Sequence, residues 1–549
     1  MQAETSNPIR TEASVGWLRR DLRAVPVAVW AAVVLNLLLM LVYTTLQPAY
    51  RGLDEAAHID MVVSLPNPLD WPAPGEKTLS HDLRATYDEA GHDGLPFARL
   101  ARDIAQQPKS ERPDFTEAGT LDRPGEATNQ MVQHPPLYYV VVAAGMELVP
   151  GTERWPFDRQ IALMRFLSLL MVAPLPLLCW LAARRLRLST TLGVVAAFLP
   201  LTMPSVQRIG ASVSNDALLI GLIGAVNVVA IAVAAGDLRR RTSVGLGLLC
   251  AAAMLVKGLA LVLPVALLLT YAVAVYRARD WRPVLVPAVI AGGIAGVLGG
   301  GWYVRNLVLF GAVQPNGYPG GDLPYERLPG GGFSAWWPTY LEAMLFRFWS
   351  ALGQPEPPQL GEDLSKTLTV ALLVLMVGGL LVASGQRTLV GVALLPFAGL
   401  TSLVAIGAYV NYQAYDRFIG VQGRYLYPAL VGMTVAAAIA LGRLTGPWRA
   451  GLPVVVLTGA GVLQLLAARA VLETYWTTAQ APGRLSDGFS AMQAWSPLPD
   501  LVVQGLWIAT VLVGLATAAT ALLLLVRREG RPAPSRPVSP AAEAAACVS

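Results

Sequence analysis

The chain has 549 residues, of which 54% are hydrophobic and only 14% are charged, and its mean hydropathy is +0.50. This balance excludes a protein made only of ordinary soluble domains and indicates a polytopic membrane protein. The net charge is +5, but acidic residues outnumber basic ones between residues 51 and 160, which argues against nucleic-acid binding.

Long apolar runs set the fold class. A hydrocarbon core about 30 Å thick needs roughly 20 apolar residues per helix, and on that basis we expect about twelve spans in an all-α protein. The predicted spans are 25–46, 161–182, 189–207, 212–235, 243–256, 258–276, 284–304, 364–384, 388–411, 425–443, 451–471 and 501–526.

Arginines mark one side of these spans. If the N-terminus is cytoplasmic, every loop on the cytoplasmic side is basic, as the positive-inside rule requires. The arginines are Arg19, Arg20, Arg23, Arg184, Arg185, Arg187, Arg239, Arg240, Arg241, Arg277, Arg279, Arg282, Arg387, Arg443, Arg449, Arg527 and Arg528. The sequence therefore predicts a multi-pass membrane protein with both ends in the cytoplasm.

This orientation requires a hairpin between Ser243 and Tyr276. A continuous helix of about 34 residues would be roughly 51 Å long, far more than the membrane is thick. Lys257 then lies at the outer tip of the hairpin. The helix that follows His134-Pro135-Pro136 must lie on the membrane surface instead of crossing.

The spans divide the chain into a cytoplasmic N-terminus (1–24), a membrane domain (25–526) and a disordered cytoplasmic tail (527–549). Cys179, Cys250 and Cys547 are too few and too badly placed for a disulfide framework.

Three extracytoplasmic loops, 47–160, 305–363 and 472–500, are large enough to build a site. The second loop contains Phe333-Ser334-Ala335-Trp336-Trp337-Pro338, which predicts an interfacial aromatic anchor leading into an amphipathic helix.

An acidic pair, Asp54 and Glu55, comes directly after the first span, and His58 follows within one helical turn. A carboxylate at the membrane surface, beside apolar helices, can take the proton of a hydroxyl that attacks a lipid-linked substrate. A plainer interpretation is that the two acids only cap a surface helix.

Polar residues gather at the outer ends of other spans as well. In order they form His134-Pro135-Pro136-Leu137-Tyr138-Tyr139, Ser214-Asn215-Asp216-Ala217-Leu218, Lys257-Gly258, Trp302-Tyr303-Val304-Arg305-Asn306 and Gln422-Gly423-Arg424-Tyr425-Leu426-Tyr427-Pro428. This ordered set resembles a bacterial group of predicted membrane glycosyltransferases, long catalogued as a domain of unknown function. The group is related to the protein O-mannosyltransferases and lipid A aminoarabinose transferases of the GT-C fold.

The resemblance spans residues 25–445 and implies transfer of a sugar from a polyprenyl-phosphate donor to a cell-envelope glycan, lipid or protein on the extracytoplasmic face. It implies that Asp54 and Glu55 are catalytic, with Asp54 as the base. The residues we expect to contact the substrates are His58, His134, Tyr138, Asn215, Asp216, Lys257, Arg305, Gln422, Arg424 and Tyr425. The arginines and the lysine suit a phosphate, because their side chains bind its oxygens directly.

Plainer interpretations stay open for several of these residues. Asn215 and Asp216 could cap a span, and the arginines could reach for lipid headgroups. Two other classes of protein also remain, a polyprenyl-diphosphate-dependent glycan polymerase or ligase and a transporter. The sequence predicts no metal site and no certain cofactor, and it leaves open whether a divalent cation assists.

Overall fold

The computed structural model describes residues 16–89, 109, 111–118, 127–350, 352, 360–476 and 484–529. Across these residues the chain is almost wholly helical, and its single β contact is an isolated antiparallel bridge between Thr78 and Thr128. The all-α prediction is confirmed.

The described chain is a succession of helices, with longer loops after α3 and after η6. The first part of the chain contains α1 (Gly16–Arg23), α2 (Val27–Leu46), α3 (Glu55–Val63), α4 (His81–Glu89), α5 (Phe115–Ala118), η1 (Gln130–Gln133), α6 (Leu137–Glu147) and η2 (Thr152–Arg154). The middle contains α7 (Phe157–Val172), α8 (Leu175–Arg185), α9 (Thr190–Phe198), η3 (Leu199–Thr202), α10 (Pro204–Gly210), α11 (Asn215–Ala234), α12 (Arg240–Met254), η4 (Gly258–Val262), α13 (Leu263–Ala278), α14 (Arg282–Ile294), the π-helical η5 (Ala295–Gly299) and α15 (Gly300–Phe310). The last part contains η6 (Pro319–Gly321), α16 (Phe333–Ser350), α17 (Glu362–Val382), α18 (Arg387–Tyr415), η7 (Gly423–Ala429), α19 (Leu430–Leu444), η8 (Gly446–Gly451), α20 (Leu452–Trp476), α21 (Leu485–Trp495) and α22 (Asp500–Glu529).

The number of spans differs from the expected twelve. Within the described residues, ten helices are long and apolar enough to cross a membrane, or eleven if the bent pair Thr190–Thr202 and Pro204–Gly210 counts as one. That pair bends by 72°, where Pro204 opens a new helix and cannot continue the old one. The second difference is the predicted span 243–256. Its helix, α12, has 15 residues and is only about 22 Å long, too short to cross the membrane.

The predicted hairpin is confirmed. The backbone leaves the helix after Met254, passes through Lys257 in an extended conformation, and resumes as η4 and α13. The predicted loop and tail limits shift slightly, because α15 continues to Phe310 and α20 to Trp476. The helix α22 also continues to Glu529, and the rest of the predicted tail, with Cys547, lies outside the described residues.

Arginine-bearing helix ends gather at one end of the bundle. Arg185 pairs with Asp21, and Arg277 lies 3.5 Å from the hydroxyl of Thr388. A cavity of about 880 Å³ at this end is lined by Arg187, Ser189, Gln386, Arg443 and Arg449 among others. The helices therefore alternate in direction as the arginine pattern predicts.

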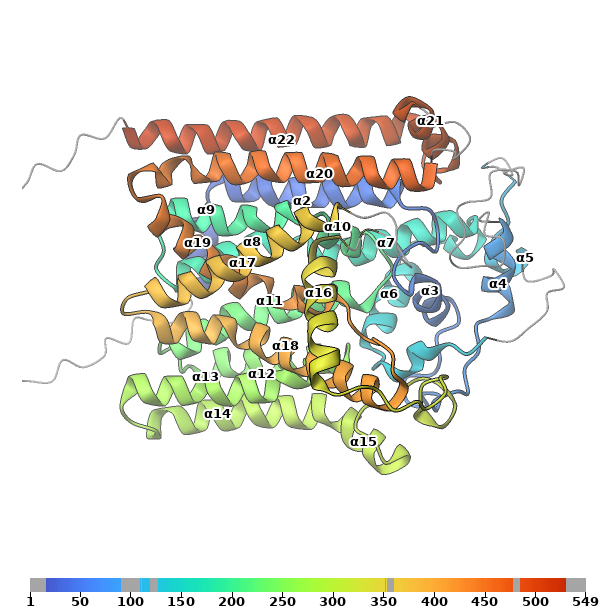
Figure 1. Cartoon of the computed structure of the whole chain (residues 1–549), viewed down its shortest axis with the longest axis horizontal. Helices are drawn as coiled ribbons and strands as arrows, with labels where there is room; N and C mark the ends of the chain where they lie inside the picture. The colour runs from blue at the N-terminus through green and yellow to red at the C-terminus, as the bar shows by residue number, and fades with distance from the viewer. Residues whose placement is uncertain are drawn as a thin grey trace, which may run out of the picture.

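Polar side chains join helices inside the bundle. Gln207 in α10 donates to Asn36 in α2 at 2.9 Å, and Gln464 in α20 donates to Gln207 at 2.9 Å. Trp476, at the end of α20, donates to the carbonyl of Leu46. The last described helix, α22, packs along α2, so the first and the last long helices lie on the same side of the bundle (Figure 1).

The loops gather at the opposite end of the bundle. Helices α3 to α6 and α21 lie there, far from the C-terminal end of α22, and α16 runs across the long helices (Figure 1). The second loop docks on the first, because Gly75 donates to Gly317 and Gln314 donates to the carbonyl of Gln133 at 2.6 Å. The predicted aromatic anchor at Phe333 begins α16, where Phe333, Trp336 and Tyr409 form a ring cluster.

Candidate functional site

The acidic pair stands where the first loop turns into α3. Asp54 precedes the helix with φ 57° and ψ 17°, a left-handed conformation that few residues other than glycine adopt and that aspartate tolerates best. This turn sends the two neighbouring side chains in different directions. The Asp54 side chain is 29% exposed, whereas that of Glu55 is fully buried.

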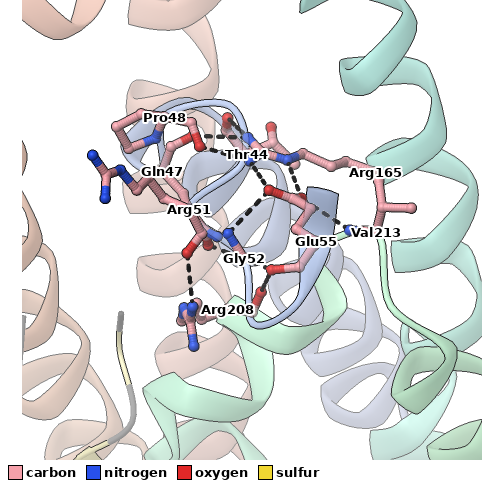
Figure 2. Close-up of polar contacts among 10 residues, drawn as sticks. Thr44, Gln47, Pro48, Arg51, Gly52, Glu55, Arg165, Arg208 and Val213 are labelled. Carbon is pink, nitrogen blue, oxygen red and sulfur yellow. Dashed lines mark hydrogen bonds and ion pairs between the residues drawn. The ribbon is translucent and has the colours of Figure 1, made fainter. Parts of the chain in front are cut away.

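Glu55 is held by four donors (Figure 2). Arg165 in α7 donates to both carboxylate oxygens, at 2.8 and 2.7 Å, and the amides of Gly52 and Val213 each donate at 3.0 Å. Burial raises the pKa of Glu55, but Arg165 and the amides outweigh it, so that the pKa lies below its usual value. Gly52 has to be glycine, because a Cβ there would lie 2.7 Å from the Cβ of Glu55.

The Arg165 guanidinium also links the end of α2 to Glu55. It donates to the carbonyls of Thr44, Gln47 and Pro48 as well as to Glu55 (Figure 2). Arg208 in α10, also buried, donates to the carbonyl of Arg51 at 3.0 Å. The sequence gives no sign that Arg165 binds Glu55.

Asp54 instead begins a chain of alternating charges, which we call the ionic chain (Asp54, Arg424, Asp216 and Lys257). Arg424 Nη2 lies 2.8 Å from Asp54 Oδ2, and its Nε lies 3.5 Å from Asp216 Oδ2. Asp216 Oδ1 in turn lies 2.7 Å from Lys257 Nζ. The ring of Tyr425 contacts both cations, 4.9 Å from Lys257 Nζ and 5.4 Å from the Arg424 guanidinium.

The four members of the ionic chain come from separate parts of the fold. Asp54 precedes α3, Asp216 lies in the first turn of α11, Lys257 lies in the hairpin break, and Arg424 lies in η7. Burial raises the pKa of Asp54, but the surrounding groups, above all the Arg424 guanidinium and also Lys257, together lower it by more, so the carboxyl is ionised at neutral pH. Two carboxylates and two cations leave the chain close to neutral.

Histidines lie next to the ionic chain. His58 Nδ1 lies 3.0 Å from the hydroxyl of Tyr139, and the His134 ring is nearly parallel to that of His58 at 6.3 Å. Burial lowers the pKa of His58 to about 4, against the opposing effect of Asp54. Burial and Lys257 lower the pKa of His134 well below its usual value. Both imidazoles are therefore neutral at pH 7.

A cavity of about 330 Å³ lies in front of these residues. Its polar wall contains Asp54, His58, His134, Lys257, Arg424 and Tyr425. Its other wall is apolar and comes from α18, through Leu403, Val404, Gly407 and Ala408, and from Leu259 and Leu261 of η4. These α18 residues share one helical face and extend from the outer end of the span toward the membrane interior.

Four other predicted residues lie off the cavity wall. Tyr138 is in the core, with its hydroxyl 2.8 Å from that of Ser168. Arg305 donates to the carbonyl of Trp71 at 2.9 Å and stacks on Trp302, so it does not meet Arg424 and Lys257. Gln422 precedes η7 half-buried, and Asn215 is buried at the start of α11. The side chain that caps α11 is that of Ser214, which accepts from the amide of Asp216.

Three lining residues, Gln133, Gln314 and Asn411, were not expected from the sequence. A glutamine or asparagine in a loop is common, and the only available sign was its position near the outer end of a span. In the described part of the chain, no group of three or more His, Cys, Asp or Glu side chains is placed to hold a metal ion. Cys179 and Cys250 are buried and free.

Residues 37–352 match a family described as predicted membrane protein, DUF2142. No curated protein matches the sequence. Among solved structures, ArnT from Cupriavidus metallidurans, in the apo state and bound to undecaprenyl phosphate, is similar at 16% identity and a TM-score of 0.42, over 94% of this chain and 76% of that one. The apo oligosaccharyltransferase of Archaeoglobus fulgidus is similar at 12% identity and a TM-score of 0.39, over 82% of this chain and 57% of that one. Scores this low carry no argument about function.

Proposed function

The chain belongs to this family of predicted membrane proteins, and on that premise we propose that it is a membrane glycosyltransferase of GT-C type. It moves a sugar from a polyprenyl-phosphate donor to a glycan, lipid or protein of the cell envelope, at the extracytoplasmic face of the bacterial cytoplasmic membrane. The observation that carries the proposal is the cavity, where the ionic chain meets an apolar wall made by membrane helices.

The donor fits both walls of the cavity. The isoprenoid chain lies along the apolar face of α18, which extends about 12 Å between Asn411 and Leu403 at 1.5 Å per residue. The phosphate lies at the polar wall, where Arg424 and Lys257 supply charge-assisted hydrogen bonds. Because both cations already contact carboxylates, they are held in place before the donor arrives.

Asp54 is the base that starts the transfer. It takes the proton of the acceptor hydroxyl while the acceptor oxygen forms a bond to the anomeric carbon. The bond between that carbon and the phosphate oxygen breaks, and its electron pair leaves with the polyprenyl phosphate, whose negative charge Arg424 and Lys257 stabilise. Attack from the side opposite the phosphate inverts the anomeric centre. The proton on Asp54 then returns to water.

Binding of the donor also changes the pKa of Asp54. In the resting site Arg424 lowers the pKa of Asp54, which makes the carboxylate a weak base. A donor phosphate that draws hydrogen bonds from Arg424 weakens its contact with Asp54 and adds a negative charge nearby. Both effects raise the pKa of Asp54 and make it a better proton acceptor.

Glu55 is a positioning residue in this mechanism. Its two oxygens are occupied by Arg165, Gly52 and Val213, so it fixes the start of α3 and with it the direction of Asp54. The buried imidazole of His58, four residues after Asp54, borders the same cavity and keeps the Asp54 side of α3 packed.

The test uses the full chain reconstituted in liposomes with radiolabelled polyprenyl-phosphate sugars and envelope acceptors. We expect label to pass from the donor to an acceptor with release of polyprenyl phosphate. Asp54→Asn should abolish the transfer, and Asp322→Asn, an exposed carboxylate in the second loop, should not. Label that crosses the bilayer on an unchanged lipid would favour a transporter, and transfer only from diphosphate donors would favour a polymerase or ligase.

A separate experiment places the site on one side of the membrane. Cysteine at Asn411, which lines the cavity, should react in intact cells with a thiol reagent that does not cross membranes. Cysteine at Arg240, at the exposed start of α12, should react only after the cells are opened. The reverse pattern would place the cavity on the cytoplasmic face.

A further inference from the structure

The cavity has a second polar region beyond the ionic chain. It is formed by Gln133, His134, Gln314 and Asn411, which come from η1 and its end, the second loop and α18. The ionic chain supplies all the charges of the polar wall. The second region is uncharged at neutral pH, because its members are three amides and one buried imidazole.

The side-chain amide of Gln314 is held by its nitrogen, and its oxygen has no hydrogen-bond partner among the described residues. Its Nε2 donates to the carbonyl of Gln133 at 2.6 Å, which sets the orientation of the group. The oxygen Oε1 is buried and faces Gly258. A Cβ at position 258 would lie 2.6 Å from this oxygen, so glycine leaves the space that the amide occupies.

His134 presents a second unused group. Its ring lies parallel to that of His58, and its Nδ1 is buried without a hydrogen-bond partner in the described parts of the chain. His58, by contrast, uses its own Nδ1 on Tyr139. A neutral imidazole has one donor and one acceptor nitrogen, so His134 can either donate a hydrogen bond to a hydroxyl or accept one from it.

Two buried polar atoms without partners are unfavourable unless a ligand or water satisfies them. A hydroxyl group suits both, because it can donate to the Gln314 oxygen and either donate to or accept from His134. A carboxylate would compete with the donor phosphate for Arg424 and Lys257. An ammonium would find no carboxylate in this region to balance its charge.

Resting on the proposed function, we infer that the transferred group is an uncharged sugar, a hexose or pentose without amino or carboxylate groups. Its hydroxyls bind Gln314 and His134, while Arg424 and Lys257 hold the phosphate. Gln314 and His134 thus determine which sugar is accepted, and the ionic chain determines that a phosphate is bound.

The test measures the affinity of the reconstituted full chain for three lipids. These are a bare polyprenyl monophosphate, the same lipid carrying a neutral hexose or pentose, and the same lipid carrying an amino sugar. We expect the neutral-sugar lipid to bind most tightly. Gln314→Leu should weaken binding of the neutral-sugar lipid by about tenfold, the worth of one hydrogen bond, and leave the bare lipid within about twofold.

Gln413→Leu is the matched control, because Gln413 is an exposed glutamine of α18 that also donates to a loop carbonyl, that of Gly331. It should change neither affinity. His134→Gln gives a second variant should Gln314→Leu fail to fold, with the same selective loss expected. An equal loss for bare and sugar-bearing lipids, no loss for either, or a preference for the amino sugar would each overturn the inference. Wild-type protein that binds none of the three lipids would overturn the proposed function itself.

Discussion

The two neighbouring acids, Asp54 and Glu55, face two different regions of the molecule. Glu55 faces a closed region between α2, α7 and α11, where Arg165 and two amides occupy both its oxygens. Asp54 faces an open cavity, where Arg424 is shared with Asp216. The same functional group is thus enclosed in one region and borders a cavity in the other. What separates them is burial, which is complete for the Glu55 side chain and leaves the Asp54 side chain 29% exposed.

The largest difference between the two regions should appear in catalysis. Asp54→Asn removes the base but keeps the size of the side chain, so we expect transfer to fall by about 10²–10⁴-fold with normal folding. The measurement is the turnover of purified protein in liposomes, beside its thermal unfolding midpoint. Near-normal turnover would mean that Asp54 is not the base.

Glu55→Gln should act on stability instead. It leaves the buried Arg165 charge without a carboxylate, which costs about 3–5 kcal/mol and lowers the yield of folded protein. The double variant Glu55→Leu with Arg165→Met removes both charges but also leaves the amides of Gly52 and Val213 and the carbonyls at the end of α2 without partners, so it should recover only part of the loss. Size-exclusion yield and the thermal midpoint measure this effect. A Glu55→Gln protein that keeps its stability but is inactive would give Glu55 a part in the reaction. The proposed difference between Asp54 and Glu55 would then be wrong.

The cation facing Asp54 gives a smaller effect, on donor binding. Arg424→Ala should weaken polyprenyl-phosphate binding by about 10- to 150-fold, because a charge-assisted contact is worth about 1.5–3 kcal/mol. Arg424→Lys should recover part of this affinity, since lysine keeps the charge but not the planar fork. Arg449→Ala, at the exposed arginine-rich end of the bundle, is the control. Equal affinity in all four proteins would leave Arg424 with no role in phosphate binding.

The smallest effect concerns the histidine on the Asp54 side. The pKa of His58 is about 4 in the folded protein and 6.5 when unfolded. Between these values the unfolded chain binds more protons, so stability falls as the pH falls from 6.5 and levels off below 4. Acidification from pH 6.5 to 5 should therefore cost about 2 kcal/mol.

Thermal midpoints measured across this pH range test the histidine effect. The slope should shrink in His58→Gln, whereas His81→Gln, changed outside the cavity, controls for the loss of an imidazole. An unchanged slope in His58→Gln would mean that another group causes the pH dependence.

Much of the fold could be predicted from the sequence, because apolar length and arginine placement are local signals. They located the hairpin at Lys257 and the outer end that carries Asp54, Asp216 and Arg424. They failed where a proline divides an apolar run, so the stretch before and after Pro204 was counted as one straight span.

The pairing within the site could not be predicted. Asp54 and Arg424 are 370 positions apart, and the pattern of one span carries no information on which distant helix end it meets. The different surroundings of Asp54 and Glu55 follow a left-handed backbone conformation at Asp54, for which the sequence has no clear sign. Gln314 was missed because its place in the cavity depends on a hydrogen bond to the Gln133 carbonyl, which the residue type alone does not indicate.

The packing of α22 along α2 constrains how the protein is made. The first membrane helix leaves the ribosome early, but its packing partner emerges only when nearly the whole chain has been synthesised. Until then Asn36 and Gln207 lie within the bilayer without Gln464, and Leu46 lacks Trp476. A truncated chain ending before α20 would therefore leave these polar groups in the bilayer without partners, which is costly. The bundle is completed only when α20 and α22 pack against α2.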